Sequence, residues 1–241
     1  MKVVLTKAQK FHDDIREKIK SLGYEIIDHG DETEEFTDEE YKCDVLVGLN
    51  PFQKSDLNKF TNLKLFQATS AGYDTIPVEE LEKKGVIFCN ARDVYSNQIA
   101  EFAVMRLLEI YKKAPMYYRQ QEEHKWLRDF KLQEITDKKV GILGTGSIGM
   151  QIAKRLKAFD AVTIGFNRSG NSAEYFDKIY KIDAFEGMTG ELDVIIVALP
   201  LNSGSEYIIN KNILEKMHSK SVLINIGRGM SVDTEALADV L

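Results

Sequence analysis

The chain has 241 residues, of which 44% are hydrophobic and 29% charged, and its formal net charge is −6. This length suits one large or two medium domains, and the negative charge argues against a nucleic acid or an anionic membrane as the main partner, although it permits a local basic pocket for a phosphate. No apolar stretch reaches membrane-spanning length and the short run Val3–Leu5 is no signal peptide, so we expect a soluble, cytoplasmic protein.

The first part of the chain alternates strand-like and helix-like patterns. Short runs of β-forming residues predict strands at Val3–Leu5, Tyr24–Asp28, Val45–Gly48, Leu63–Thr69 and Val86–Asn90. Helices are expected at Lys7–Leu22, ending at Gly23, and around Ser55–Phe60 and Val78–Lys84. Strands that alternate with helices pair in parallel, so this part is predicted to be a five-stranded flavodoxin-like unit.

Two other features of this part have simple structural explanations. The acidic stretch Asp31–Glu40 is expected to be a solvated loop or helix face. Cys43 and Cys89 lie far apart in apolar runs, so both are expected to be buried, reduced thiols.

The second part begins with a helical segment and then returns to alternating strands and helices. Asn97 to about Glu123 lacks glycine and carries apolar residues at helical spacing, with a break expected near Pro115 and an arm through Trp126 and Phe130. The later elements expected are strands Lys139–Leu143, Val162–Phe166, Asp193–Leu199 and Val222–Ile226, and helices Ser147–Phe159 and from Asp233 onward. The chain stops within that last helix without a terminal glycine, so we expect a shortened form of a longer protein.

The strongest local signal is a glycine pattern between a strand and a helix. Residues 140–149 read Val-Gly-Ile-Leu-Gly-Thr-Gly-Ser-Ile-Gly, the G-x-G-x-x-G string of dinucleotide sites in its required strand-to-helix context. Gly144 permits the tight turn, Gly146 lets the backbone approach a pyrophosphate, and Gly149 allows close helix packing. The predicted cofactor-binding residues here are Gly144, Thr145, Gly146, Ser147, Ile148 and Gly149. The alternative is a tight turn without a ligand.

The end of the next strand indicates which dinucleotide binds. NAD enzymes usually place an acidic residue there for the ribose 2′-hydroxyl, whereas this chain has Asn167, Arg168 and Ser169. A guanidinium can pair with a 2′-phosphate that a carboxylate would repel, and Ser169 can donate a hydrogen bond to it. The sequence therefore predicts NADP as the preferred cofactor, with NAD as an alternative. A competing interpretation is that Arg168 stacks on the adenine or faces solvent.

Five segments occur in an order that identifies a family. They are Leu65–Asp74, Asn97–Glu101, Val140–Gly149, Val197–Asn202 and Leu223–Asp233. In this order they resemble the D-isomer-specific 2-hydroxyacid dehydrogenases, over essentially the whole chain. The phosphoglycerate-dehydrogenase-like and the glyoxylate/hydroxypyruvate-reductase-like branches match equally well.

The resemblance implies an α/β fold of two doubly wound parallel-sheet domains. Residues 1–96 would form a flavodoxin-like substrate domain, and residues 97–241 a Rossmann cofactor domain that begins with the interdomain helix and is incomplete at its C-terminus. The reaction implied is hydride transfer between the nicotinamide and C2 of a small D-2-hydroxyacid or 2-oxo acid, in a cleft that closes between the domains.

The resemblance also assigns roles to single residues. Backbone N–H groups of Ala71 and Gly72, between Ser70 and Tyr73, would hold the substrate carboxylate, although an ordinary turn would look the same. Arg228 would be catalytic, because its guanidinium can hold the carboxylate while it polarises the neighbouring carbonyl. Further residues expected beside the cofactor are Asn97, Leu199, Pro200, Ile226 and Gly227. Glu101 is interpreted as a helix residue favoured by the helix dipole.

The family's proton donor has no counterpart in this sequence. The family uses a histidine general acid with a glutamate partner, both well beyond the arginine, and residues 229–241 contain no histidine. None of His12, His29, His124 and His218 matches a family position, and His124 and His218 are expected on the surface. The hypothesis that the protein is an enzyme therefore applies to the full-length form, and this chain is expected to lack the histidine general acid. The alternatives are a nucleotide-sensing, corepressor-like protein-binding module and a fragment without its own function.

The resemblance further implies a homodimer that forms through the cofactor domain and the arm. Tyr117, Tyr118, Trp126 and Phe130 suit such an interface, although they could equally form the core of the arm. No metal, nucleic-acid or membrane partner is expected.

Overall fold

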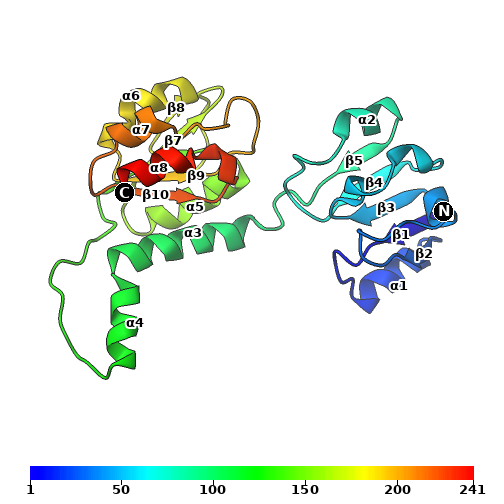
Figure 1. Cartoon of the computed structure of the whole chain (residues 1–241), viewed down its shortest axis with the longest axis horizontal. Helices are drawn as coiled ribbons and strands as arrows, with labels where there is room; N and C mark the ends of the chain where they lie inside the picture. Colours follow the sequence, from blue (N-terminus) through cyan, green and yellow to red (C-terminus); the bar gives the residue numbers. More distant parts are fainter. The chain divides into compact units, whose positions relative to one another are not determined.

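The computed structural model describes all 241 residues, and the chain divides into two compact units, Met1–Val94 and Tyr95–Leu241. Each unit is built on one five-stranded parallel sheet with helices, which confirms the predicted α/β class (Figure 1). None of the helices combines the length and the apolar character that a membrane span requires.

The first unit has the flavodoxin-like strand order β2-β1-β3-β4-β5. Its strands are β1 (Lys2–Leu5), β2 (Glu25–Asp28), β3 (Val45–Gly48), β4 (Leu65–Ala68) and β5 (Ile87–Cys89). Its helices are α1 (Asp13–Ser21) and α2 (Val78–Lys83), with 3₁₀ turns at Glu40–Lys42, Pro51–Gln53 and Leu57–Lys59. All neighbouring strands pair in parallel, so their carboxyl ends lie at one edge of the sheet. The direction of strand order reverses between β1 and β3 there.

The core of the first unit is rich in aromatic side chains. Leu46 and Phe66, from the two central strands, are fully buried. Phe60 packs edge-to-face against Tyr41 at 4.9 Å and Phe36 at 5.2 Å between ring centroids. Such ring pairs add to the area that they bury, so the irregular segments between β2 and β4 are fixed to the sheet by their rings.

Three expectations for this unit were wrong in part. The first helix begins at Asp13 and not at Lys7, because the preceding segment bonds elsewhere: the Lys7 N–H donates to the Gly30 carbonyl at 3.1 Å. The acidic stretch is not simply solvated, since its last residue, Glu40, is buried. Cys43 is a buried free thiol as expected, but Cys89 is exposed because its strand is an edge strand.

The second unit has the strand order β10-β9-β6-β7-β8 of a Rossmann sheet. Its strands are β6 (Lys139–Leu143), β7 (Val162–Asn167), β8 (Lys178–Lys181), β9 (Val194–Val197) and β10 (Val222–Asn225). Its helices are α3 (Ser96–Tyr111), α4 (Ala114–Glu122), α5 (Ser147–Lys157), α6 (Phe185–Met188), α7 (Lys211–Lys216) and α8 (Thr234–Val240), with 3₁₀ turns at Ile182–Ala184, Thr189–Glu191 and Gly229–Ser231. The strand β8 was not predicted.

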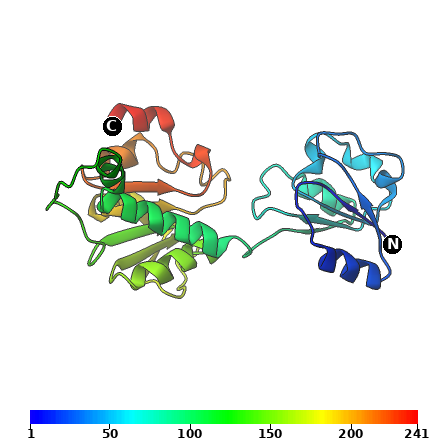
Figure 2. The same cartoon turned by 90° about the horizontal axis from the view of Figure 1, so that it is seen from below.

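Helices cover both faces of this second sheet. On one face α3 and α5 lie side by side (Figure 2), and they form one apolar cluster with Val194 and Ile196 of β9. On the other face α6, α7 and α8 pack against a second cluster that contains Ile195 and Val197. Because side chains alternate along a strand, the fully buried run of β9 supplies both clusters.

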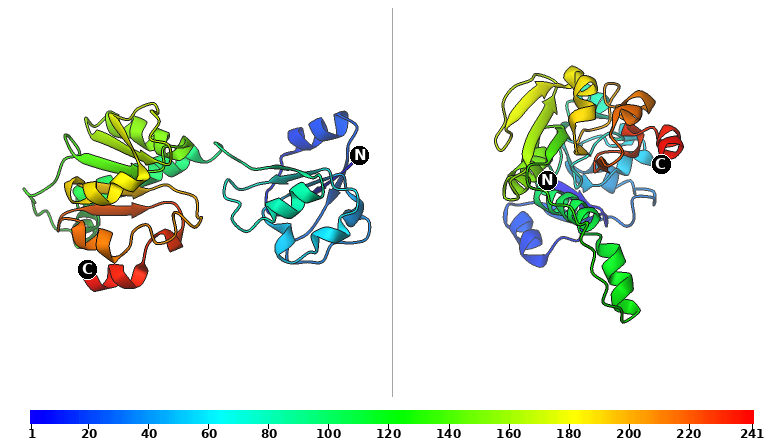
Figure 3. Two further views of the ribbon diagram at one scale, coloured as in Figure 1. Left: turned by 90° about the horizontal axis from the view of Figure 1, so that it is seen from above. Right: turned by 90° about the vertical axis from the view of Figure 1, so that its left-hand side faces the viewer.

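The long helix at the start of this unit is broken, as expected, just before Pro115. Helix α3 ends at Tyr111, Lys113 has a left-handed φ of 51°, and Pro115 lies in the first turn of α4. Helix α4 projects away from the sheet of its own unit (Figure 3). Trp126 and Phe130 in the following arm are 89% and 88% exposed, so these two side chains are not core residues of the arm.

Candidate functional site

The glycine loop lies where the strand order of the second sheet reverses. It follows β6, which has β7 on one side and β9 on the other, and ligands of such sheets bind outside the carboxyl ends at this point. Gly144 has a φ of 99°, and a Cβ there would lie 2.7 Å from the Ala198 carbonyl oxygen. A Cβ at Gly149 would overlap the Gly144 carbonyl oxygen. The backbone therefore requires glycine at both positions.

The backbone N–H groups of this loop are available to an anion. Those of Thr145, Gly146, Ser147 and Ile148 donate to no protein acceptor. Gly146 is the N-cap of α5 and provides no side-chain cap, and a Cβ built on it would meet nothing within 4 Å. Free N–H groups, the positive end of the helix dipole and open space beside the backbone together fit a bound pyrophosphate.

The loop after β7 is held by the side chain of Asn167. Its Nδ2 donates to Thr145 Oγ1 at 2.8 Å and to the Asn171 carbonyl at 3.1 Å, and its Oδ1 accepts from the Gly170 N–H at 2.6 Å. Asn167 thus ties this loop to the glycine loop. Arg168 and Ser169 lie exposed between these anchored residues, and the Arg168 guanidinium has no hydrogen bond or ion pair with the protein.

The loops after β9 and β10 pack closely, backbone against backbone. A Cβ at Gly227 would lie 2.7 Å from the Leu199 carbonyl oxygen, and the Ile226 N–H donates to the Val197 carbonyl at 3.0 Å. Ser205 Oγ donates to the Pro200 carbonyl at 2.6 Å, which fixes the loop after β9 and leaves Pro200 exposed. Leu199, Pro200, Ile226 and Gly227 therefore lie at the same edge of the sheet as the glycine loop.

Arg228 follows β10 at this same edge. It is half-buried, and its Nη1 donates to the Gly227 carbonyl at 3.3 Å. Its own carbonyl accepts from Asn225 Nδ2 at 2.8 Å, and Asn225 Oδ1 accepts from the Gly227 N–H at 3.0 Å. The side-chain amide of Asn225 thus braces the turn that positions Arg228.

In the first unit the loop Ser70–Tyr73 follows β4. Its carbonyls are bound, since Ser70 Oγ donates to the Gly72 carbonyl at 2.7 Å and Asn90 Nδ2 to the Ala71 carbonyl at 2.8 Å. The N–H groups of Ala71 and Gly72 donate to no protein acceptor. Tyr73 is exposed and packs edge-to-face on Phe88 at 5.7 Å between ring centroids. The loop therefore has two free N–H donors, and hydrogen bonds to the carbonyls of the same two residues hold its conformation.

The start of α3 contributes a residue that the sequence did not single out. Ser96 is buried, and its Oγ accepts a hydrogen bond from Ser147 Oγ at 2.7 Å, which joins α3 to the first residue of α5. Asn97 is exposed and lies against Arg155 of α5, with Oδ1 3.3 Å from Nη2. Glu101 also pairs with Arg155, at 2.7 Å. A serine one residue before a motif carries no signal of its own, so only the packing of the two helices reveals Ser96.

The four histidines lie away from these loops or are committed elsewhere. His124 and His218 are exposed, as expected, and so is His12. His29 is buried: its Nδ1 is 3.0 Å from Glu40 Oε1, and its ring stacks on Phe36 at 3.8 Å. No group of His, Cys, Asp or Glu side chains is arranged to hold a metal ion.

Comparison with known proteins places the chain among its relatives. Residues 104–241 match the family model described as "D-isomer specific 2-hydroxyacid dehydrogenase, NAD binding domain". The chain belongs to the D-isomer-specific 2-hydroxyacid dehydrogenase family. The match begins within α3 and includes the glycine loop, the loop after β7 and Arg228, so these three features lie in the family's NAD-binding domain.

Relatives within this family carry different names. A glyoxylate reductase of Pyrococcus furiosus is 31% identical over 203 residues, which are 78% of this chain and 60% of that protein. A D-2-hydroxyacid dehydrogenase (NAD(+)) of Clostridioides difficile is 30% identical over 194 residues, 80% of this chain and 58% of that protein. The chain thus spans about three fifths of the length of the curated relatives that it matches.

A solved structure supports the fold. The NADPH-dependent glyoxylate/hydroxypyruvate reductase of Sinorhizobium meliloti superposes with a TM-score of 0.81 at 23% identity, over 100% of this chain and 76% of that protein.

Proposed function

We propose that this chain holds the nucleotide and the substrate carboxylate in an NADP-preferring reductase of small 2-oxo acids, which in reverse is a D-2-hydroxyacid dehydrogenase. The observation that carries the cofactor choice is the exposed, unpaired guanidinium of Arg168 at the end of β7. Family members that prefer NAD would place a carboxylate at this position.

The glycine loop and the loop after β7 would hold the dinucleotide in separate ways. The N–H groups from Thr145 to Ile148 would bind the pyrophosphate at the N-terminus of α5. Arg168 and Ser169 would bind the 2′-phosphate, with Asn167 keeping both at a fixed distance from the glycine loop. When bound, the dinucleotide supplies the hydride chemistry.

Two groups of the chain suit a substrate carboxylate. The free N–H groups of Ala71 and Gly72 suit a carboxylate, and the Arg228 guanidinium can bind it and polarise the adjacent carbonyl. The names of several relatives, glyoxylate reductase and glyoxylate/hydroxypyruvate reductase among them, favour a small 2-oxo acid. His29 is committed to Glu40 and the other three histidines are exposed, so we propose that none of the four is the proton donor and that this chain alone turns over slowly or not at all.

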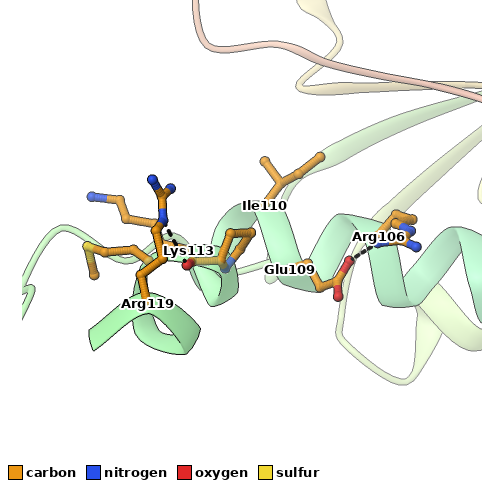
Figure 4. A pocket seen from close by; sticks show the side chains of 7 residues that line it. Arg106, Glu109, Ile110, Lys113 and Arg119 are labelled. Carbon is orange, nitrogen blue, oxygen red and sulfur yellow. Dashed lines mark hydrogen bonds and ion pairs between the residues drawn. The ribbon is translucent and has the colours of Figure 1, made fainter. Parts of the chain in front are cut away.

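The corner between α3 and α4 supports a proposed homodimer. It forms an open groove of about 490 Å³, in which Arg106 pairs with Glu109 at 2.6 Å and Arg119 Nε donates to the Pro115 carbonyl at 3.3 Å (Figure 4). Ile110 in the groove is 50% exposed, and Trp126 in the arm is 89% exposed. Aromatic residues, methionine and arginine are enriched in protein interfaces, and a second copy of this chain is the occupant we propose for the groove and the arm. A monomeric mass by light scattering would refute this.

The test of the cofactor proposal is a binding measurement on the whole chain. Calorimetric titration is expected to give tighter binding of NADPH than of NADH. Arg168→Asp should weaken NADPH binding by about 10- to 100-fold and leave NADH binding equal or improved, because a charge-assisted hydrogen bond contributes about 1.5–3 kcal/mol. Arg128→Asp, an exposed arginine in the arm, is the matched control. Unchanged NADPH affinity in Arg168→Asp would refute the assignment.

The substrate proposal is tested by NADPH oxidation, followed by absorbance, with glyoxylate, hydroxypyruvate and bulkier 2-oxo acids. Little or no turnover, together with tight NADPH binding, is the expected outcome for this chain. Rapid turnover would show that another group donates the proton and would contradict that part of the proposal.

A further inference from the structure

The lysine that ends the edge strand β8 lies beside the loop that carries Arg168. In the parallel register of β7 and β8, Lys181 is the Cα partner of Asn167. Paired residues of neighbouring strands project to the same face of a sheet. The two side chains therefore leave the sheet on one face, at its carboxyl edge.

The neighbouring glycine shows where the lysine chain lies. Gly170 has a φ of 74°, and a Cβ built on it would lie 3.1 Å from Lys181 Cγ and 4.0 Å from its Cε. The whole aliphatic chain of Lys181 thus runs alongside Gly170, the residue whose N–H is bound by Asn167 Oδ1. A larger residue at position 170 would displace the lysine as well as strain the backbone.

The charge of this lysine is not used within the protein. Lys181 is exposed and its ammonium forms no ion pair or hydrogen bond, whereas the ammonium of Lys157 in the same unit pairs with Asp177 at 2.7 Å. The guanidinium of Arg168, which belongs to this loop, is likewise unpaired. Two cations border one short loop, Asn167–Gly170, and that loop contains no carboxylate.

We propose that Lys181 is a second cation for the 2′-phosphate of NADP, which it binds from the β8 side while Arg168 binds from the loop. The proposal rests on the proposed nucleotide site and adds a residue that determines cofactor specificity. A phosphate monoester is close to a dianion at neutral pH. One planar guanidinium can engage two of its oxygens, and a flexible ammonium adds a point charge on another side.

The experiment compares ligands that differ only in the 2′-phosphate. Calorimetric titrations of the whole chain use NADP⁺ against NAD⁺, and adenosine 2′,5′-bisphosphate against 5′-AMP. Lys181→Gln is expected to weaken binding of the two 2′-phosphorylated ligands by about three- to tenfold and to leave the other two within about twofold. The salt dependence of NADP⁺ binding should also become shallower, because one screened charge pair is lost.

Two further variants keep the test specific. Lys178→Gln removes an exposed lysine from the other end of the same strand and should change none of the four affinities. Gly170→Ala retains both cations but displaces Lys181, and it should reduce the preference for the 2′-phosphorylated ligands. Equal weakening of all four ligands by Lys181→Gln would show a merely structural role and overturn the proposal, and so would no change at all.

The outcomes separate this inference from the function on which it rests. If Arg168→Asp abolishes the preference for NADP⁺ and Lys181→Gln does not alter it, the lysine assignment alone fails. If the unaltered chain shows no preference for NADP⁺, the cofactor proposal fails and the lysine assignment fails with it.

Discussion

The two sheets differ in how they use the backbone N–H groups at the point where their strand order reverses. In the first unit, the point where strand order reverses lies between β1 and β3, and the Glu32 carboxylate occupies it. Its Oε1 accepts from Thr6 Oγ1 at 2.7 Å and from the Leu49 N–H at 2.6 Å, and its Oε2 accepts from the Asn50 N–H at 2.7 Å. In the second unit, the N–H groups of Thr145 to Ile148, in the loop after β6, have no protein acceptor.

This difference shows that the same kind of parallel sheet can either bind its own carboxylate at the switch point or leave N–H donors there for a ligand. An internal carboxylate accepts from the donors at the switch point of the first sheet, and a Cβ at Gly48 would overlap Glu32 Oε1, so glycine there lets the carboxylate approach. The second sheet leaves the N–H groups of its glycine loop for a ligand, and neither Arg168 nor Lys181 pairs with a carboxylate. Strand order alone therefore does not mark a nucleotide site, and the side chains at the switch point decide.

The largest effect is expected from a substitution that disturbs the backbone of the glycine loop. Gly149→Ala places a Cβ into the Gly144 carbonyl oxygen, which should destabilise the second unit by about 1–3 kcal/mol and weaken NADPH binding by about 100-fold or more. Gly146→Ala is the matched control for stability, because a Cβ there meets nothing within 4 Å and φ is −74°. That variant should keep its melting temperature and weaken only NADPH binding. Unchanged binding in Gly149→Ala would contradict the anion site.

The internal carboxylate of the first unit provides the next effect. Glu32→Ala removes three charge-assisted hydrogen bonds and should cost about 2–3 kcal/mol in chemical denaturation. The freed donors should then accept an external anion, so sulfate should raise the melting temperature of Glu32→Ala more than that of the unaltered chain. Glu35→Ala loses only an exposed pair with Lys59 and should cost less than 1 kcal/mol, roughly. Equal costs for the two variants would refute the special role of Glu32.

The sequence predicted the central elements well because their physical signals are local. The strands β6 and β9 are continuous apolar runs and are fully or almost fully buried, as expected for parallel strands covered on both faces. The edge strand β8 reads Lys-Ile-Tyr-Lys and was missed, because lysines at both ends hide so short an apolar pair. The sequence also correctly predicted that positions 144 and 149 require glycine for their backbone geometry, because a glycine in this motif is itself the signal of a tight turn or a close approach.

Residues that act through distant partners could not be found in this way. Glu32 and Glu40 lie in an acidic stretch that resembles any solvated surface, and only the folded chain brings Thr6 and Leu49 to Glu32. Lys181 lies 14 residues beyond Asn167 and faces it only through the register of β7 and β8. A pattern of charges along the chain carries no record of such pairings.

A smaller effect is expected from acid, again in the first unit. Burial raises the pKa of the Glu40 carboxyl, but hydrogen bonds from the Thr37 N–H and hydroxyl and from His29 outweigh it and hold that pKa below its ordinary value. Glu40 therefore contributes stability that is present above its ordinary pKa of 4.5 and is lost as pH falls through the lower, folded-state pKa. Glu40→Gln should lower stability at pH 7 by about 1–2 kcal/mol and flatten the acid limb below pH 4.5. A variant with the same acid limb as the unaltered chain would contradict this.

The smallest effect is expected in the rate at which a reagent labels the two cysteine thiols, and this rate shows which unit a substitution destabilises. Both thiols lie in the first unit: Cys89 is exposed, whereas burial raises the pKa of Cys43 to about 12. A thiol reagent at neutral pH should therefore label Cys89 at once and Cys43 only through unfolding of this unit, because the thiolate is the reactive form. In a Cys89→Ser background, Glu32→Ala should speed labelling of Cys43 by about tenfold or more, whereas Gly149→Ala should change it little. If Gly149→Ala speeds the labelling of Cys43 as much as Glu32→Ala does, that substitution also destabilises the first unit. The contrast between a switch point occupied by Glu32 and a switch point with free N–H groups would then not hold.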